Sequence, residues 1–498
     1  MSAPGGRPPL DATLCGLVWR CVEDAREAFL GHRAGGGYMG PDWRPPELSY
    51  FDSGLPRLTQ KSGFASGTVD FDGVFNVGGG PDTIDVRQLD GWAPLLRYCE
   101  GDEELRRSFL VKEVQEPGSR AEDFFHYDVW SIPGSVFDRL MRLRGDSFTY
   151  EDFLPVYLEI EAGHLREDLS FAVMVPVVLT LFEEDALRIA PDLGLRRLSD
   201  PEQLARISEY GAVSSPANEL VVGAATHALI LVGHTAPNFC GDTYPPYDRP
   251  GWWPTGPIDR FFDALRVITG VDTGYAQLCM LPLGGWAQTY RLDLPPLILG
   301  PQVRRYPEHF DDFGWLRDDV EPISGEALSE VGDLYGALGE RPRLSLAARR
   351  LSAAMLQTDD QDKILDLLIG LEALLGDEAK SEMTYKLALR TAAVLAATGD
   401  FDPSVVFADV KRLYAYRSAV AHGDAERARK RRTVHRPDGS GHSAIDLAAR
   451  YLRRTIRFLS TQEDLDDPAE IDARLLLRPL VREEAGGADD AAQAGGRT

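Results

Sequence analysis

The stretch QDKILDLLIGLEALL, residues 361–375, decides the fold of the C-terminal part of this chain. Its leucines and isoleucines recur at steps of three and four residues, which places them on one face of an α-helix, as the core of a helical bundle requires. The residues of this stripe are Ile364, Leu367, Leu368, Leu371, Leu374 and Leu375. Gly376 follows directly, at the position expected for a helix C-terminal cap. The stretch therefore predicts a helix with one buried side.

The same helical periodicity continues on both sides of this stretch. Upstream, Ser324 predicts the N-cap of a helix that runs to about Leu338, before residues 339–342 break the pattern. Gly399 lies where a further C-terminal cap is expected. Other amphipathic segments of helical length cover residues 344–357, 382–398, 404–422 and 443–460. We therefore predict an all-α bundle over residues 321–482.

The first 320 residues have a different pattern. Short apolar runs there alternate with turns such as Gly78-Gly79-Gly80, which is typical of mixed α and β structure. Helices are predicted at Asp11–Leu30 and Pro257–Ile268. Strands are predicted at Gly67–Val77, Phe171–Phe182, Leu220–Val232 and Tyr275–Leu283.

The expected fold class is α+β and multidomain, because a chain of 498 residues is too long for one ordinary core. Residues 1–320 are expected to form a mixed α/β sensing or regulatory region of one or two subdomains. Residues 321–482 are expected to form the helical bundle. Residues 483–498, rich in Ala, Gly and Asp, are expected to be a disordered tail.

The charge of the chain is segregated. Its net charge is −25, which would ordinarily argue against a nucleic-acid partner. Leu344–Ser460, however, contains 19 Lys and Arg against 15 Asp and Glu, a net charge of +4, so the remaining residues carry −29. Residues 344–460 are thus the part of the chain with an excess of cations.

The sequence gives no sign of export, of a membrane or of a metal. The start, MSAPGGRPPL, lacks an apolar signal-peptide core, and no apolar run reaches the ~20 residues of a membrane span. The five cysteines form no Cys-x-x-Cys pair. We expect a cytoplasmic protein with no membrane partner, no metal and no cofactor.

The chemistry-bearing motif is LYAYRSAVAHG, residues 413–423. Tyr414, Ser418 and His422 follow at four-residue steps and share one helix face. Arg417, five residues before His422, is rotated by ~140° on an ideal helix. Bringing Arg417 and His422 together needs a long Arg side chain, a distortion near Gly423, or a second copy of the motif across a dimer interface.

These residue types match the demands of RNA cleavage without a metal. His422 can move protons to and from the 2′-hydroxyl and the leaving oxygen. Arg417 can stabilise phosphorane charge through paired donors, and Ser418 can orient either group. The alternative is structural: an Arg in a salt bridge at a helix end, and a His favoured by the helix dipole.

Three blocks give the motif a family context: LLIGLEALL (367–375), YKLALRTAAV (385–394) and LYAYRSAVAHG (413–423). In order and spacing they resemble the Apea-like HEPN family, over roughly residues 325–480. The resemblance implies a metal-independent endoribonuclease in which two domains pair, so that two Arg and two His line one cleft. It also implies a role in anti-phage defence. Partners would be RNA and a second copy of the chain, in a homodimer or higher homo-oligomer.

The resemblance leaves a second reading open, because many HEPN domains have lost activity and act as antitoxins or scaffolds. In that reading, the chain is a nucleotide-binding or partner-binding scaffold. Arg417 and His422 would then only stabilise an interface.

If the chain is instead an active enzyme, a phage-encoded or nucleotide trigger would act on its acidic N-terminal region.

Further residues are expected to assist the motif. Glu372 and Arg390 are polar residues in apolar helical patterns, and we predict that they form a buried ion pair that supports the motif helix. The alternative is that they are partly exposed residues on a helix flank. Tyr414 is expected to be a further supporting residue. A basic loop after the motif and the last helix are expected to contact RNA phosphates. Their cations are Arg427, Arg429, Lys430, Arg431, Arg432, Arg450, Arg453 and Arg454. The alternative for such a charge run is a solvated surface.

Overall fold

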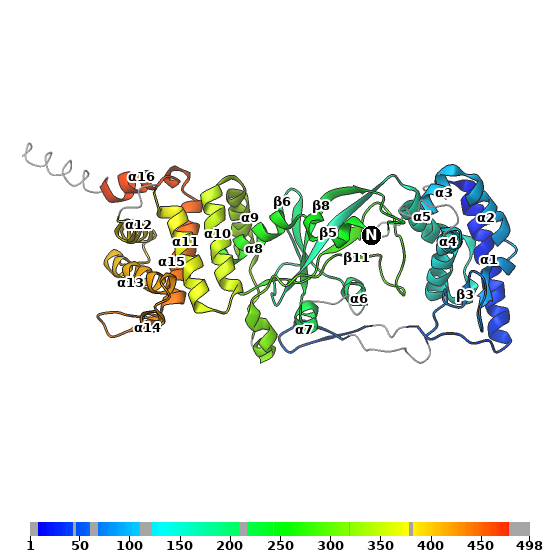
Figure 1. Cartoon of the computed structure of the whole chain (residues 1–498), viewed down its shortest axis with the longest axis horizontal. Helices are drawn as coiled ribbons and strands as arrows, with labels where there is room; N and C mark the ends of the chain where they lie inside the picture. The colour runs from blue at the N-terminus through cyan, green and yellow to red at the C-terminus, as the bar shows by residue number, and fades with distance from the viewer. Residues whose placement is uncertain are drawn as a thin grey trace, which may run out of the picture. The chain divides into compact units, whose positions relative to one another are not determined.

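The chain folds into two compact units, each assembled from several stretches of sequence. The structure is a computed structural model (Figure 1). It describes residues 8–42, 46–59, 68–109, 121–208, 217–242, 244–317, 319–377 and 382–477. Unit 1 comprises Met1–Val178, Asp192–Trp253 and Tyr275–Arg304. Unit 2 comprises Leu179–Pro191, Pro254–Gly274 and Arg305–Thr498.

This division differs from the boundary expected near residue 320. Two stretches from the first 320 residues, Leu179–Pro191 and Pro254–Gly274, belong to the same unit as the C-terminal helices. The tail predicted to be disordered, 483–498, lies outside the described residues. The molecule is a mixture of α and β structure with a helical C-terminal part, as expected.

The helices of unit 1 enclose an aromatic core. Helix α1 starts where the Asp11 carboxylate accepts hydrogen bonds from the first backbone amides. Phe29 of α1 packs edge-on against Phe137 of α4, in a cluster that also buries Trp130 and Phe153. The helices are α1 (Ala12–Ala34), α2 (Trp92–Gly101), α3 (Glu103–Phe109), α4 (Ala121–Arg144), α5 (Tyr150–Leu165), α6 (Asp200–Ser208) and α7 (Glu219–Gly223).

An antiparallel sheet forms the second half of unit 1. Its central strand, β5, lies between β8 and β10, with Val173 opposite Leu231 and, on the other side, Met280. Strand β7 pairs with the far side of β8, and β11 pairs with β10. Nearly every residue of β5 is buried, so both of its faces are covered. The strands of this sheet that lie wholly within unit 1 are β5 (Asp168–Val178), β7 (Leu193–Arg197), β8 (His227–Pro237), β10 (Cys279–Pro282) and β11 (Ile298–Leu299).

The remaining strands are short. Those of the first 100 residues pair as β1 with β2 and as β3 with β4. In unit 2, β6 packs against α9. The bounds are β1 (Glu47–Tyr50), β2 (Pro56–Thr59), β3 (Phe75–Asn76), β4 (Ile84–Asp85), β6 (Ala186–Ala190), β9 (Gly274–Tyr275), β12 (Thr433–His435) and β13 (Gly441–Ser443).

Unit 2 is dominated by the helices predicted from periodicity, and each forms within two residues of its expected bounds. Ser324 caps α9 as predicted, and this helix continues through Gly339 to Glu340. The helices are α8 (Thr255–Thr269), α9 (Gly325–Glu340), α10 (Pro342–Leu356), α11 (Asp360–Leu375), α12 (Met383–Ala397), α13 (Pro403–Ala421), α14 (Ala425–Lys430), α15 (Ala444–Ser460) and α16 (Pro468–Ile471).

Helix α11, the stretch that decides the fold, lies at the centre of this bundle. It contacts α10, α12, α13 and α15, and its predicted leucine stripe is buried. Gly370 lies within this helix where a Cβ atom would come 2.6 Å from a methyl group of Leu452 on α15. A side chain at this position would therefore crowd the packing of α11 against α15.

No helix in the described part of the chain is long and apolar enough to cross a membrane.

Candidate active site on helix α13

The motif occupies the last two turns of α13. The helix begins at Asp402, whose carboxylate accepts hydrogen bonds from the amides of Ser404 and Val405. It ends at His422, whose amide donates to the Ser418 carbonyl at 3.1 Å. Gly423, with φ of +71°, then turns the chain away. His422 thus lies at the negative end of the helix dipole, which favours a cation there.

Arg417 is directed towards α11. Its Nη2 atom lies 3.8 Å from Oε1 of Glu372, and its guanidinium lies 5.5 Å from the centre of the Tyr414 ring. The Arg417 side chain is 28% exposed and that of Glu372 is 23% exposed. Among the described residues, neither Nε of Arg417 nor Oε1 of Glu372 has a hydrogen-bond partner. The pair is therefore loose, and it leaves hydrogen-bonding capacity unused.

Tyr414 lines the same contact. Burial raises the pKa of its phenol, and the negative charge of Glu372 raises it further, while the positive charge of Arg417 opposes this effect. The phenol therefore stays protonated at neutral pH. Tyr414, Glu372 and Arg417 together form a group from two adjacent helices, α13 and α11.

His422 and Ser418 are placed differently from Arg417. His422 is exposed, and Ser418 is half-buried one turn earlier. Because α13 is regular up to Ala421, the ~140° rotation between Arg417 and His422 is retained. No helix distortion near Gly423 brings the two side chains to one face. Of the routes to convergence considered above, the long Arg side chain and a second copy of the motif are left.

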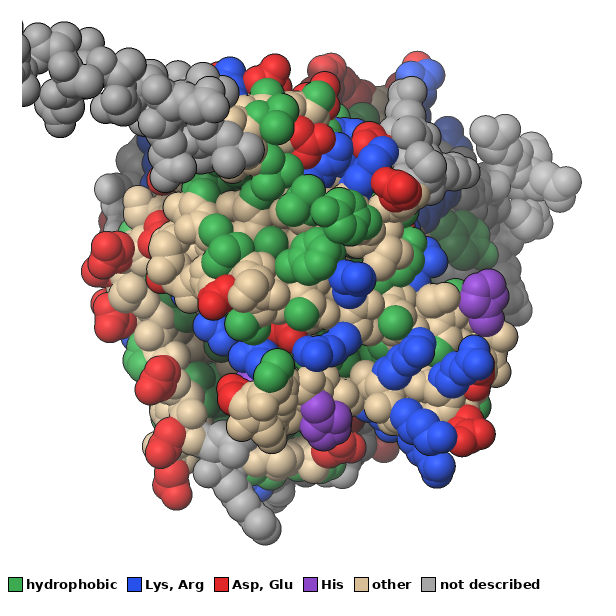
Figure 2. Space-filling model, turned by 90° about the vertical axis from the view of Figure 1, so that its left-hand side faces the viewer, with side chains coloured by type: hydrophobic (Ala, Val, Ile, Leu, Met, Phe, Trp, Pro, Cys, Tyr) green, Lys and Arg blue, Asp and Glu red, His purple; other side chains and the backbone are tan. Residues whose placement is uncertain are grey.

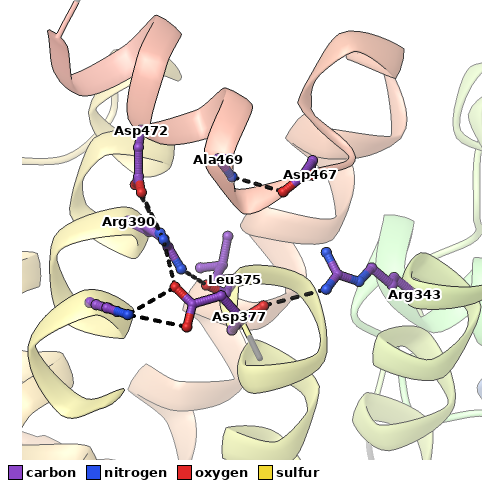
Figure 3. A network of polar contacts seen from close by, with 9 residues as sticks. Arg343, Leu375, Asp377, Arg390, Asp467, Ala469 and Asp472 are labelled. Atoms are coloured by element: carbon purple, nitrogen blue, oxygen red, sulfur yellow. Dashed lines mark hydrogen bonds and ion pairs between the residues drawn. The ribbon is translucent and has the colours of Figure 1, made fainter. Parts of the chain in front are cut away.

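The prediction that Glu372 and Arg390 form an ion pair is wrong. Arg390 donates instead to both carboxylate oxygens of Asp472, at 2.8 and 2.7 Å, and to Oδ2 of Asp377 at 3.1 Å (Figure 3). It also donates to the Leu375 carbonyl at 2.7 Å. Arg390 thus joins the end of α11 to the C-terminal segment, while Glu372 remains the partner of Arg417.

The segment predicted as a basic loop is ordered as helix α14 and a hairpin of β12 and β13. Arg436 fixes the hairpin, because its Nη2 atom donates to buried Asp409 of α13 at 2.7 Å. Tyr451 of α15 donates to the same carboxylate at 2.8 Å. The cations of this segment are therefore held beside α13.

Most of these cations are exposed, and several have acidic partners. Arg427 pairs with Asp424 at 3.2 Å, and Lys430 pairs with Glu426 at 2.7 Å. Arg432 lies 3.9 Å from Asp360. Arg429 is exposed on α14, and Arg431 donates to a carbonyl oxygen of α13. Figure 2, which views the end of unit 2 bearing α12 and α13, shows Lys and Arg side chains gathered near histidines.

The arginines of α15 differ in their surroundings, and not all of them are exposed like the cations of α14. Arg453 packs against Gly270, which follows α8, and burial together with the neighbouring Arg454 lowers its pKa. Arg454 lies 3.8 Å from Asp400, and Arg450 stacks over the ring of Phe401 at 4.9 Å. Arg453 is thus a packing residue, and the prediction that it contacts RNA is not supported by its position.

The sequence prediction of the site did not include two cations of α13, Lys411 and Arg412. They line a pocket with residues of α14 and β12. A signal for Lys411 exists in the sequence, because Lys411, Ser418 and His422 follow at steps of seven and four residues on one helix face.

The described residues include no group of three or more His, Cys, Asp or Glu side chains able to hold a metal ion.

No family model, curated protein or solved structure matches this chain.

Proposed function

We propose that the chain is a HEPN-type endoribonuclease that cuts RNA without a metal ion, with Arg417 and His422 as its catalytic residues. The observation that carries this proposal is the loose ion pair of Arg417. Its Nη2 atom lies 3.8 Å from Glu372, too far for a hydrogen bond, and its side chain is 28% exposed. Such an arginine retains donors for a substrate phosphate.

The reaction follows from the chemistry of the two side chains. The 2′-oxygen of the RNA forms a bond to the adjacent phosphorus, and the bond from phosphorus to the 5′-oxygen breaks. His422 accepts the proton of the 2′-hydroxyl and then donates it to the leaving 5′-oxygen. Arg417 stabilises the charge on the phosphorane oxygens. The products are a 2′,3′-cyclic phosphate and a 5′-hydroxyl, and excess EDTA leaves the rate unchanged.

The rotation between Arg417 and His422 supports an active site shared by two copies of the chain. In this arrangement, His422 of one copy acts opposite Arg417 of the other, with Ser418 orienting the reacting groups. Mixing inactive Arg417→Ala and His422→Ala chains should then restore cleavage, because mixed dimers contain one intact Arg and one intact His. No recovery, with dimers seen by light scattering, would rule out the shared site.

The decisive experiment compares His422→Ala with His442→Ala, a change of the same type on β13. Loss of a positioned acid or base should lower the cleavage rate by roughly two to four orders of magnitude. His442→Ala should cleave as fast as the wild type. RNA binding by His422→Ala should be nearly unchanged. If purified His422→Ala cuts RNA as fast as the wild type, the chain is instead the nucleotide-binding or partner-binding scaffold.

We further propose that the ribonuclease is a cytoplasmic anti-phage effector, with unit 1 as its sensing or regulatory part. Unit 1 contains 23 Lys and Arg against 37 Asp and Glu, a net charge of −14, and this supports the assignment because negative charge competes with RNA for a basic surface. Expression of the wild type should arrest growth or do so on phage infection, whereas His422→Ala should not. Equal growth and equal phage resistance of the two strains would contradict the defence role.

A further inference from the structure

A pocket of about 370 Å³ opens on unit 2 between α13, α14 and β12. The side chains at its wall that carry or can carry positive charge are Lys411, Arg412, Lys430, Arg431 and His435. No Asp or Glu is among the described residues that line it. A concave site with one sign of charge concentrates ligands of the opposite sign. The pocket therefore selects an anion.

The carboxylates near the pocket do not neutralise its cations. Asp409 lies 3.4 Å from Arg412, but the same carboxylate also binds Arg436 and Tyr451. Glu426 pairs with Lys430, and both side chains are more than two-thirds exposed, so this pair is weak. Lys411 lies over the Phe407 ring at 5.5 Å, and within the described ranges it has no ion pair of 4 Å or less. The cations of the pocket are thus available to an incoming anion.

The pocket is also held in shape. Arg431 donates from Nη1 to the Ala415 carbonyl of α13 at 2.6 Å, which fixes its guanidinium against the helix. The hairpin that carries His435 is fixed to α13 through Arg436 and Asp409. A ligand therefore binds without first ordering the wall of the pocket, which lowers the entropic cost of binding. The planar guanidinium of Arg431 and the ammonium groups of Lys411 and Lys430 can all donate to the tetrahedrally arranged oxygens of a phosphate.

The position of the pocket relates it to the catalytic motif. Lys411, Ala415, Ser418 and His422 follow at steps of four, three and four residues, so they lie along one face of α13. Ala415 in the pocket wall is roughly 10 Å along the helix axis from His422, at 1.5 Å per residue. A strand with a phosphate in the pocket would thus extend along α13 towards His422.

We propose that this pocket binds a phosphate group of the RNA backbone, away from the bond that is cut. The inference rests on the proposed ribonuclease function, which supplies RNA as the ligand. It adds Lys411, Arg412 and His435 to the residues that contact RNA, and it assigns to Lys430 and Arg431 a defined phosphate. The same phosphate chemistry is present in a free nucleotide, which the experiment must separate from RNA.

The test measures binding of a labelled, fully 2′-O-methylated single-stranded RNA to the full-length protein. This RNA cannot be cut by attack of a 2′-oxygen, so binding is measured without cleavage. The pocket variant is Lys411→Gln/Lys430→Gln. The control is Arg343→Gln/Arg349→Gln, which removes the same charge from two exposed positions of α10. Thermal unfolding confirms that both variants are folded.

The pocket variant should weaken binding roughly ten-fold and reduce the slope of log K against log salt by roughly 0.7, as expected when the contact with one phosphate of a single strand is lost. The control should bind as the wild type does. If both variants bind like the wild type, or weaken equally, the pocket is not a phosphate site and the proposal fails.

Two further arms separate the possible sources of the phosphate. Inorganic phosphate and ATP are titrated into the wild type and the pocket variant, and thermal stabilisation is recorded. Stabilisation by ATP that depends on the pocket, without binding of RNA, would overturn the assignment to RNA. Binding of methylated RNA that depends on the pocket, in a protein that cuts no unmodified RNA, would support the pocket while refuting the proposed ribonuclease.

Discussion

Arg390 and Arg417 lie on adjacent helices of unit 2, but their guanidinium groups have very different surroundings. Arg390 is 6% exposed and donates to two carboxylates and a carbonyl oxygen, all within 3.1 Å. Arg417 is 28% exposed, its carboxylate partner is 3.8 Å away, and its Nε has no hydrogen-bond partner among the described residues. The first arginine is fully used by the fold, while the second is not. Between these two arginines, the fold therefore uses the donors of Arg390 and leaves those of Arg417 loosely paired.

The largest expected effect is on stability and concerns Arg390. Arg390→Met should lower the free energy of unfolding by about 3 kcal/mol, because it leaves Asp377, Asp472 and the Leu375 carbonyl without their shared donor. Arg417→Met should cost less than about 1 kcal/mol, since its pair is long and partly exposed. Urea unfolding of both variants measures the contrast. Equal losses would show that the two arginines serve the fold alike.

The second effect is on catalysis and concerns the geometry of Arg417. Arg417→Lys should lower kcat by roughly 100-fold, because an ammonium retains the charge but not the paired donors. Arg390→Lys should retain the wild-type kcat in the fraction of protein that is folded. Single-turnover cleavage at saturating RNA provides the measurement. A fully active Arg417→Lys would mean that only the charge at this position matters.

A smaller effect is expected in the pH dependence of stability. A hydrogen bond from Lys386, and another from Arg390, hold the pKa of Asp377 below its ordinary value. The ionised carboxylate therefore stabilises the fold at neutral pH, and this contribution is lost as the pH falls through the lowered pKa. Asp377→Asn should be less stable than the wild type at pH 7, with the difference shrinking in acid. A constant difference across the pH range would exclude this linkage.

The smallest effect is expected for Arg454, which represents an exposed pair on the same bundle. Its nearest carboxylate oxygen, on Asp400, is 3.8 Å away, and both side chains are more than a third exposed. Arg454→Gln should change the free energy of unfolding by less than about 0.5 kcal/mol. Thermal unfolding of Arg454→Gln, measured together with that of Arg390→Met, gives the comparison. A loss comparable to that of Arg390→Met would show that exposure does not rank these arginines.

The helices of unit 2 could be predicted because their stripes of apolar residues and their caps are local signals. Ser324 and Asp402 mark helix starts that the structure retains. Unit 1 offered fewer such signals. Leu220–Val232 is one apolar run, but Asn218 caps a short helix at its start and only its second half enters strand β8.

Other expectations for unit 1 met the same difficulty. The predicted strand Gly67–Val77 is mostly turn where the structure describes it, and only Phe75–Asn76 pairs as a strand. The predicted strand Phe171–Phe182 is confirmed by β5 as far as Val178, and the predicted helix Asp11–Leu30 is confirmed by α1. Long, strongly patterned segments were therefore predicted better than short ones.

The positions of the motif residues on α13 could also be predicted, but their partners could not. The spacing of Tyr414, Ser418 and His422 fixes their common face on any regular helix. Which carboxylate faces Arg417 depends on the rotation of α11 against α13, a tertiary property. Arg390 finds Asp472 at a separation of 82 residues in sequence, and no local pattern connects the two.

Because each unit is assembled from several separate stretches of the chain, the gene cannot be cut at one point into two parts that each encode a whole unit. Helix α8, which comes from the stretch Pro254–Gly274, packs against α9, α10 and α15, and it buries Phe261 and Phe262. A gene fragment that begins at codon 321 would therefore encode helix α13 and its motif without one wall of the surrounding bundle. Recombination at that point would transfer an incomplete module, so donor and recipient would have to exchange α8 as well.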